Sequence, residues 1–182
     1  MKLHLGCGRR FIPGFVHIDI DDFPHIDHRA PIDALPMIGD GKADLIYCSH
    51  AFEYFDRQRA LEALREWRRV LKIDGILRLA VPDFEALVRV YQESRDLSQI
   101  LGPLFGRMTV QTERGARVLY HRTAYDYESL EKLCRAAGFR AVARYDWRRT
   151  IHRDFDDFSQ AYIPLADKDN GLLISLNVEA VK

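Results

Sequence analysis

The sequence has no excess of charge of either sign and few cysteines. Among its 182 residues, 27 are Lys or Arg and 27 are Asp or Glu, so the formal net charge at pH 7 is zero. A chain without overall positive charge has no general attraction to nucleic acid or to an anionic membrane, and we expect neither as a partner. The three cysteines, Cys7, Cys48 and Cys134, are odd in number and far apart, which is typical of reduced thiols packed in a cytoplasmic protein.

Long apolar runs are also missing. No stretch approaches the roughly 18 consecutive apolar residues of a transmembrane helix, and the N-terminus lacks the apolar segment of a signal peptide. We therefore expect no membrane span, no export and a cytoplasmic location. There is no internal repeat, and the length suits one domain that buries roughly two thirds or more of its unfolded surface. We expect residues 1–182 to form a single domain, as a monomer or a homodimer.

The usual phosphate-binding motifs are absent. No G-x-x-x-x-G-K-[ST] loop occurs, and Phe11 stands where a dinucleotide fingerprint needs its third glycine or alanine. What is present is a turn with two glycines, Gly6 and Gly8, directly after the apolar run at residues 2–5. Because glycine lacks a Cβ, the backbone there can adopt positive φ and a ligand can lie directly against it.

A carboxylate ends the next apolar run. Asp19 closes the run at residues 15–20, and the carboxyl ends of neighbouring parallel strands meet at the edge where α/β sheets bind ligands. A carboxylate at this position can accept charge-assisted hydrogen bonds from both hydroxyls of a ribose. Together with the missing phosphate motifs, this favours a pocket for an adenosine compound without phosphates. Asp21 is the alternative ribose acceptor.

Apolar runs alternate with helical patterns, which predicts an α/β fold with a mostly parallel sheet. The expected strands are residues 2–5, 15–20, 43–48 and 75–81. The run at 43–48 shows little alternation, as in a central strand with helices on both faces. Helices are expected at 57–71, at 84–94 and from 127 to the stop at Gly138, with N-caps Asp56, Asp83 and Asp126.

Two later segments differ from this pattern. Residues 172–181 alternate apolar and polar side chains, which predicts a strand near the edge of the sheet, antiparallel to the others, with one face in water. Residues 98–120 contain several glycines and show weak periodicity. Because a loop of this length in a compact domain is often functional, we expect it to act as a lid or loop on the substrate side.

With these motifs in order, the chain resembles the class I S-adenosylmethionine-dependent methyltransferases, and in particular a short bacterial branch described only as predicted methyltransferases. The resemblance covers nearly the whole chain and depends on the glycine turn, Asp19, the stretch at residues 43–54, the segment at 70–83 and the pattern at 136–139. It implies a doubly wound, mostly parallel seven-stranded sheet with an antiparallel last strand. It also implies S-adenosylmethionine as cofactor, with S-adenosylhomocysteine as product.

The resemblance places the cofactor along the first strands. It implies that Gly6, Cys7 and Gly8 cradle the methionine part and that Asp19 holds the ribose. Asp27 or Asp33 would lie at the adenine, and we assign Asp33 as the expected residue while Asp27 stays open.

The resemblance also implies that two residues after the fourth strand, Ser49 and His50, line the pocket near the sulfonium. Methyl transfer is an in-line displacement that depends mainly on near-attack geometry, so no acid or base is compulsory. A hydroxyl acceptor does need a base, and His50 and His121 are the candidates because imidazole titrates near neutral pH. Asp83, a helix cap at a strand end, is a candidate for substrate contact. We expect O-methylation of a small-molecule or saccharide acceptor.

Some features depart from the family pattern and leave alternatives open. Only residues 7–15 separate the first two strands, and Glu53-Tyr54 stands where the family commonly has a Glu-His pair. These departures suggest a catalytically silent protein that binds S-adenosylmethionine. A nicotinamide-dependent oxidoreductase is a third reading, disfavoured by Phe11. The Asp and His residues at 21–28 have metal-like spacing, but they lie on a proline-containing stretch that we expect to face solvent, so no metal is expected.

Overall fold

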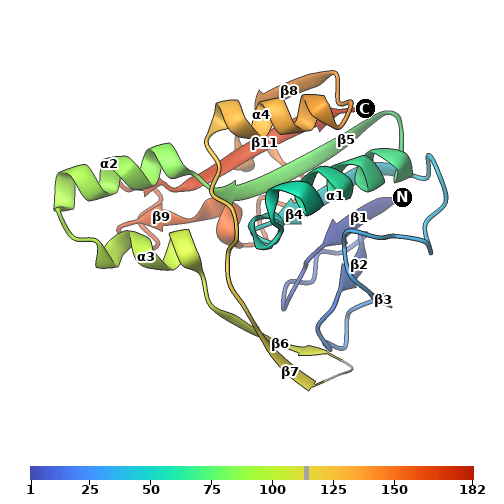
Figure 1. The fold of residues 1–182 in the computed structure, drawn as a ribbon, viewed down its shortest axis with the longest axis horizontal. Coiled ribbons are helices and arrows are strands. Elements are labelled where there is room, and N and C mark those ends of the chain that lie inside the picture. Colours follow the sequence, from blue (N-terminus) through green and yellow to red (C-terminus); the bar gives the residue numbers. More distant parts are fainter. Residues whose placement is uncertain (113–114) are drawn as a thin grey trace.

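The computed structural model describes residues 1–112 and 115–182, and within them seven strands form one sheet (Figure 1). The strand order is β3-β2-β1-β4-β5-β11-β8. The first five run parallel to their neighbours, and β11 is antiparallel to both β5 and β8. The predicted fold class is therefore confirmed. The bounds are β1 Lys2–Leu5, β2 Val16–Asp19, β3 His28–Arg29, β4 Ala43–Ser49, β5 Leu71–Pro82, β8 Ala141–Arg144 and β11 Ser175–Val181.

Three of the α-helices were predicted from their caps. Asp56 accepts a hydrogen bond from the N–H of Arg59, Asp83 caps the next helix, and Asp126 forms a capping box with Ser129. None of the helices in the described residues is long and apolar enough to cross a membrane. The bounds are α1 Arg57–Val70, α2 Phe84–Ser94, α3 Ser98–Phe105 and α4 Tyr127–Ala136.

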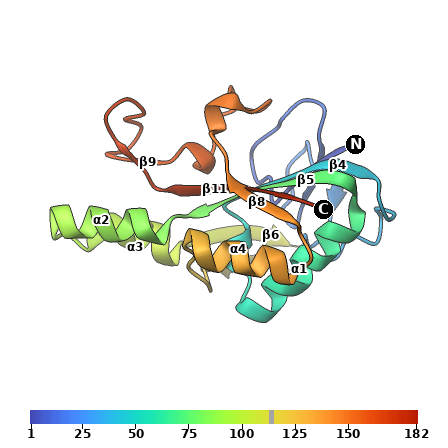
Figure 2. The same ribbon diagram turned by 90° about the horizontal axis from the view of Figure 1, so that it is seen from above.

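The main core lies between the sheet and the helices α1 and α4, which cover one face (Figure 2). Trp67 of α1 is fully buried there, and its indole N–H donates to the carbonyl of Ile32 at 2.6 Å. The cysteines Cys7, Cys48 and Cys134 are buried free thiols.

The expectation of helices on both faces of β4 is wrong in the described residues. Figure 2 shows loops and short turns on the face opposite α1 and α4. There Tyr47 stacks on the ring of His152 at 3.9 Å between centroids and packs with Ile12 and Phe15. The cause is the short link between β1 and β2, because a parallel crossover with a helix needs roughly a dozen or more residues.

The last strand also differs from its prediction. β11 is antiparallel as expected, but two of its polar side chains are covered: Ser175 and Asn177 are each 3% exposed. Two 3-10 turns, η2 Trp147–Arg149 and η3 Phe158–Gln160, belong to the segment on this side, and the side-chain amide of Asn177 donates to the carbonyl of Ser159 at 2.8 Å. The edge position belongs to β8, which the sequence pattern did not place.

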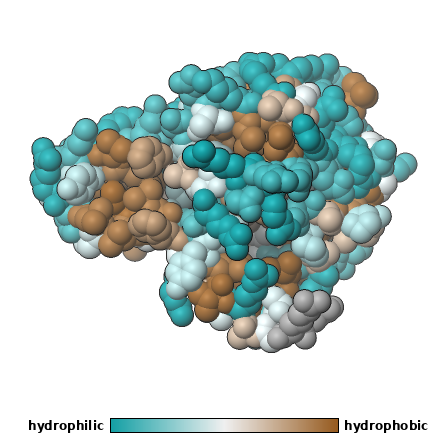
Figure 3. All heavy atoms as spheres, viewed as in Figure 1, coloured by the Kyte–Doolittle hydropathy of each residue, from teal (hydrophilic) through white to brown (hydrophobic). Residues whose placement is uncertain are grey.

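The predicted lid at 98–120 has regular structure. It contains α3 and a hairpin of β6 Met108–Thr112 and β7 Gly115–Leu119, while residues 113–114 lie outside the described residues. α2 and α3 pack on a small second core that also contains Ile174, next to the short strands β9 Tyr162–Ile163 and β10 Leu172–Leu173. Apolar side chains gather on the outer surface of these two helices (Figure 3); the exposed ones are Phe84, Val88, Tyr91, Leu97, Leu101 and Phe105.

The capping box of α4 gives a test of local stability. Asp126→Ala removes the acceptor for the Ser129 N–H, so we expect the free energy of unfolding to fall by about 1 kcal/mol in urea titrations. Lys132→Ala is the matched control on the same helix, because it removes only an exposed ion pair with Glu128 that contributes roughly 0.2–0.5 kcal/mol. Equal losses in the two variants would show that the cap has no special role.

Candidate functional site

A cavity of about 880 Å³ opens at the carboxyl ends of β1, β2 and β4 and reaches the β6–β7 hairpin. Among the predicted residues, its walls bring together positions as far as 44 residues apart in the chain, Gly6 and His50. The predicted residues that line it are Gly6, Cys7, Gly8, Asp19, Asp33, Ser49 and His50. Asp27, Asp83 and His121 are not among its lining residues.

The two glycines of the first turn have different structural roles. Both have positive φ, +63° at Gly6 and +51° at Gly8. A Cβ added at Gly6 would lie 2.3 Å from the Cβ of Ala51, so the loops after β1 and β4 touch at this point. A Cβ at Gly8 would meet no atom within 4 Å, because Gly8 faces the cavity. Gly6 thus sets the close approach of the loops, and Gly8 leaves room for a ligand.

Asp19 connects the glycine turn to the end of β2. Its Oδ2 accepts a hydrogen bond from the N–H of Gly8 at 2.8 Å, and its Oδ1 accepts one from the N–H of Asp21 at 2.9 Å. An ionised carboxylate has about four lone-pair sites, so two remain for ligand hydroxyls. Asp21 also lines the cavity, and its Oδ1 accepts from the N–H groups of Asp22 and Gln111.

The β6–β7 hairpin is fastened to the far side of the cavity. The N–H of Gln111 donates to Asp21 at 2.9 Å, and the guanidinium of Arg29 donates to the carbonyl of Gln111 at 2.7 Å. Met108, Thr109 and Val110 of β6 line the cavity. These contacts join residues about 80 to 90 positions apart, and no local pattern in the sequence could have indicated them.

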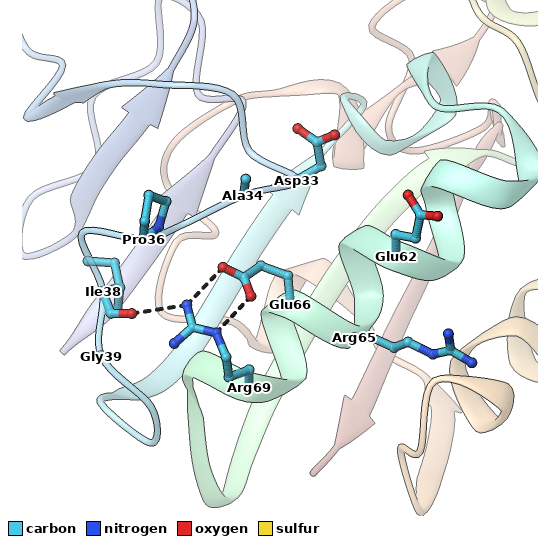
Figure 4. Close-up of a pocket in the computed structure, with 9 residues that line it drawn as sticks. All are labelled: Asp33, Ala34, Pro36, Ile38, Gly39, Glu62, Arg65, Glu66 and Arg69. Atoms are coloured by element: carbon cyan, nitrogen blue, oxygen red, sulfur yellow. Dashed lines mark hydrogen bonds and ion pairs between the residues drawn. The ribbon is translucent and has the colours of Figure 1, made fainter.

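Asp33 lies where a loop passes α1, and its carboxylate pairs with Arg59. The same loop borders a second cavity of about 760 Å³, shown in Figure 4. In it, Arg69 donates to Glu66 and to the carbonyl oxygens of Leu35 and Ile38. Because Arg69 and Glu66 find their hydrogen-bond partners within the protein, we do not interpret the second cavity as a reaction site. Their hydrogen bonds hold the loop of Asp33 against α1.

His50 follows β4 with an unusual backbone and two engaged ring nitrogens. Its φ is +51°, in the left-handed region that non-glycine residues rarely adopt. The Nε2 atom lies 3.0 Å from the Oγ of Ser175, and the Nδ1 atom lies 3.4 Å from Oε1 of Glu53. Burial, and then the neighbouring His121, lower the pKa of His50 to about 3. His50 is therefore a neutral imidazole on the cavity wall.

His121 and Glu53 lie behind His50. His121 Nδ1 is 3.0 Å from the carbonyl oxygen of Pro103, and its Nε2 is 3.7 Å from Oε1 of Glu53. Burial lowers the pKa of His121. Glu53 is fully buried, and burial raises its pKa to about 8. The sequence interpretation missed Glu53 as a partner of His50; its position three residues after His50 was the available signal.

Asp83 and Asp27 serve the scaffold around the cavity. Asp83 caps α2 through the N–H groups of Glu85 and Ala86, and its Oδ2 accepts from Arg144 at 3.2 Å. Asp27 accepts a hydrogen bond from the N–H of His17 in β2 at 2.8 Å. Neither carboxylate lines the cavity.

The Asp and His residues at 21–28 do not form a metal site in the structure. Within residues 1–112 and 115–182, no group of three or more His, Cys, Asp or Glu side chains is arranged to hold a metal ion. His25 packs instead among aromatic rings, with Phe23 stacked at 6.0 Å and Phe11 edge-on at 6.1 Å between centroids.

Residues 15–79 match a family described as a methyltransferase domain. None of the curated proteins searched matches the chain. Among solved structures, a SAM-dependent methyltransferase from Archaeoglobus fulgidus is 16% identical, with a TM-score of 0.57 and coverage of 100% of this chain and 85% of that one. A SAM-dependent methyltransferase from Thermotoga maritima is 16% identical, with a TM-score of 0.56 and coverage of 100% and 81%.

A third structure contains ligands. It is the 1,6-didemethyltoxoflavin-N1-methyltransferase of Burkholderia thailandensis, with bound 1,6-didemethyltoxoflavin and S-adenosylhomocysteine. It is 14% identical to this chain, with a TM-score of 0.55 and coverage of 100% of this chain and 70% of that one. Likenesses at these identities show a shared fold.

The two glycines offer a matched pair of substitutions. Gly8→Ala places a side chain at positive φ in open space, so we expect a loss of about 1–2 kcal/mol in unfolding free energy. Gly6→Ala adds an overlap with Ala51, which costs a further ~1–3 kcal/mol. Urea unfolding followed by circular dichroism measures both. A Gly6→Ala protein as stable as Gly8→Ala would contradict the close contact of the loops.

Proposed function

We propose that this chain is a class I S-adenosylmethionine-dependent methyltransferase and that it methylates a hydroxyl group of a small molecule or saccharide. Its methyl donor is S-adenosylmethionine, which supplies a methyl group already activated by the sulfonium. The single observation that carries the proposal is the cavity at the carboxyl edge of β1, β2 and β4, with Asp19 and His50 on its walls.

The residues present fit the cofactor. The cavity wall at Gly8 is free of side chains, and a Cβ there would meet nothing within 4 Å, which leaves space for the methionine part beside Cys7. Asp19 keeps lone pairs for the two ribose hydroxyls after its bonds to the backbone. We assign Asp33 to the adenine end because its loop, clasped to α1, lines the same cavity.

The acceptor side supports a hydroxyl substrate. Ser49 and His50 lie on the cavity wall after β4, where we place the sulfonium and the acceptor. An oxygen nucleophile loses a proton as it is methylated, and a positioned histidine is a common base for such a proton. The main contribution of the site is then to hold acceptor and methyl group in line, in near-attack geometry. Asp83 and His121 would act only through neighbouring residues, since neither lines the cavity.

One test of the cofactor site is the substitution Asp19→Asn. Hydrogen bonds to a charged group contribute roughly 1.5–3 kcal/mol, so the Kd for S-adenosylmethionine should rise about tenfold to 100-fold. Isothermal titration calorimetry measures the change, with thermal melting as a check on folding. Asp21→Asn is the matched comparison, because Asp21 lines the same cavity but its Oδ1 accepts from the N–H of Gln111 in the hairpin. A larger loss in Asp21→Asn than in Asp19→Asn would transfer the ribose role to Asp21.

The acceptor class is tested by turnover. We expect the protein, given S-adenosylmethionine with a labelled methyl group and a fractionated cell extract, to produce labelled ethers in the small-molecule or saccharide fraction. Methyl ethers survive mild alkali, whereas methyl esters are hydrolysed, and mass spectrometry separates both from N-methyl products. Cofactor binding without any product would favour the silent binding protein instead. Labelled N-methyl products would contradict the hydroxyl acceptor while leaving the cofactor assignment intact.

A further inference from the structure

The hydrogen bonds behind the cavity indicate which tautomer His50 has in the structure. The amide of Asn177 donates to the carbonyl of Ser159, so its Oδ1 faces Ser175. The hydroxyl of Ser175 donates to that Oδ1 at 3.0 Å. Its single hydrogen is thereby used, and the contact of 3.0 Å with His50 must have His50 Nε2–H as the donor. The neutral ring then has its lone pair on Nδ1.

A second histidine points its lone pair at the same carboxyl group. His121 Nδ1 faces a carbonyl oxygen, which can only accept, so Nδ1 carries the hydrogen and Nε2 the lone pair. The two lone pairs, on His50 Nδ1 and His121 Nε2, lie 3.4 Å and 3.7 Å from Oε1 of Glu53. Neither carboxyl oxygen of Glu53 has a hydrogen-bond donor among the described residues. A proton on Glu53 resolves this arrangement, because the O–H group then faces the two acceptors.

We propose that Glu53 is the positioning residue that sets the state of His50: as a neutral acid it keeps the hydrogen of His50 on Nε2, and as a carboxylate it holds that hydrogen on Nδ1 and frees Nε2 for the acceptor. The backbone holds Glu53 in this position. Glu53 lies in η1 (Phe52–Tyr54), and its backbone carbonyl accepts a hydrogen bond from the N–H of Arg122 at 2.8 Å. The inference rests on the proposed hydroxyl acceptor.

At neutral pH the pair holds two hydrogens, one on Glu53 and one on His50 Nε2. Loss of one proton to solvent leaves the Glu53 carboxylate bonded to His50 Nδ1–H, and Nε2, now without a hydrogen, no longer donates to Ser175. During transfer the bond between sulfur and methyl breaks, the bond between methyl and acceptor oxygen forms, and the hydroxyl proton passes to His50 Nε2. The imidazolium that results is stabilised by the Glu53 carboxylate, and Ser175 can turn to accept from Nε2 again.

The thiol and the two phenols around Glu53 stay neutral over the pH range of the ionisation of Glu53. Burial raises the pKa of Cys48 on β4, of Tyr54 on η1, to about 12, and of Tyr125 ahead of α4. The nearby cation Arg122 is half exposed and pairs with Asp56 at 3.8 Å. Burial also raises the pKa of Glu53 to about 8, which places its ionisation within reach of ordinary buffers.

The first experiment reads the tautomer without any turnover. Nitrogen-15 NMR of the histidine rings, assigned with His50→Phe, should show His50 protonated on Nε2 at pH 6.5 and on Nδ1 above pH 9. Glu53→Gln should keep Nε2–H throughout, because the two amide hydrogens of Gln can donate to both lone pairs and cannot be lost. Glu128→Gln, the same change at an exposed site of α4, is the control and should behave as the wild type.

The second experiment measures kcat/KM for the acceptor against pH. Between pH 7 and 9 the wild type and Glu128→Gln should gain about tenfold, and Glu53→Gln should show no such step while its Kd for S-adenosylmethionine stays unchanged. A His50 that carries Nδ1–H at pH 6.5, or a Glu53→Gln protein with the wild-type pH step, would overturn the inference. If no hydroxyl acceptor is found, the NMR result alone decides the role of Glu53, so failure of the proposed function is recognised separately.

Discussion

The site depends on a close contact between two loops. Gly6, directly after β1, meets Ala51, just after β4, at a distance that excludes any Cβ on the glycine. β1 lies between β2 and β4, so the strand order reverses at β1. Open α/β sheets bind ligands at such a point, beside the carboxyl ends of the strands. The contact brings the glycine turn, the end of β2 and the turn that carries His50 and Glu53 to one cavity.

The short link between β1 and β2 has consequences beyond the cofactor loop. Without a helix there, one face of the sheet is covered by loops from both ends of the chain, and it buries polar rings beside aliphatic side chains such as Ile12 and Leu45. His4, Tyr47 and His152 stack in this layer, and burial lowers the pKa of His4 and of His152 to about 3. The hydroxyl of Tyr47 pairs with Asp157, and both His4 and Asp157 reach the cavity wall. This layer therefore forms part of the boundary of the site.

The buried polar groups behind His50 have the same origin. Ser175 and Asn177 lie on β11, which is internal to the sheet, and the segment at 145–160 closes over them. Their hydrogen bonds have fixed directions, and a fixed direction at one end of a chain of donors and acceptors determines the proton position at the other. At the other end of these hydrogen bonds lies Glu53, whose carboxyl oxygens have no hydrogen-bond donor among the described residues and whose charge state we propose to set the tautomer of His50.

The sequence by itself determined the strands β1, β2, β4, β5 and β11, the helices α1, α2 and α4 with their caps, and the glycine turn followed by Asp19, because each depends on residues close together in the chain. It also placed Gly8, Ser49 and His50 at the edge where the cavity lies. Their roles in the reaction stay predictions.

Only the tertiary structure decided the rest. It set the internal position of β11 and the loops over the second face of the sheet. It also set the hydrogen bond between Gln111 and Asp21 and the contact between Glu53 and His121. These depend on contacts between residues far apart in the chain, where burial and the directions of hydrogen bonds are set by packing and leave no periodic pattern in the sequence. For that reason the alternation of polar residues along β11 predicts a face in water, although Ser175 and Asn177 are buried.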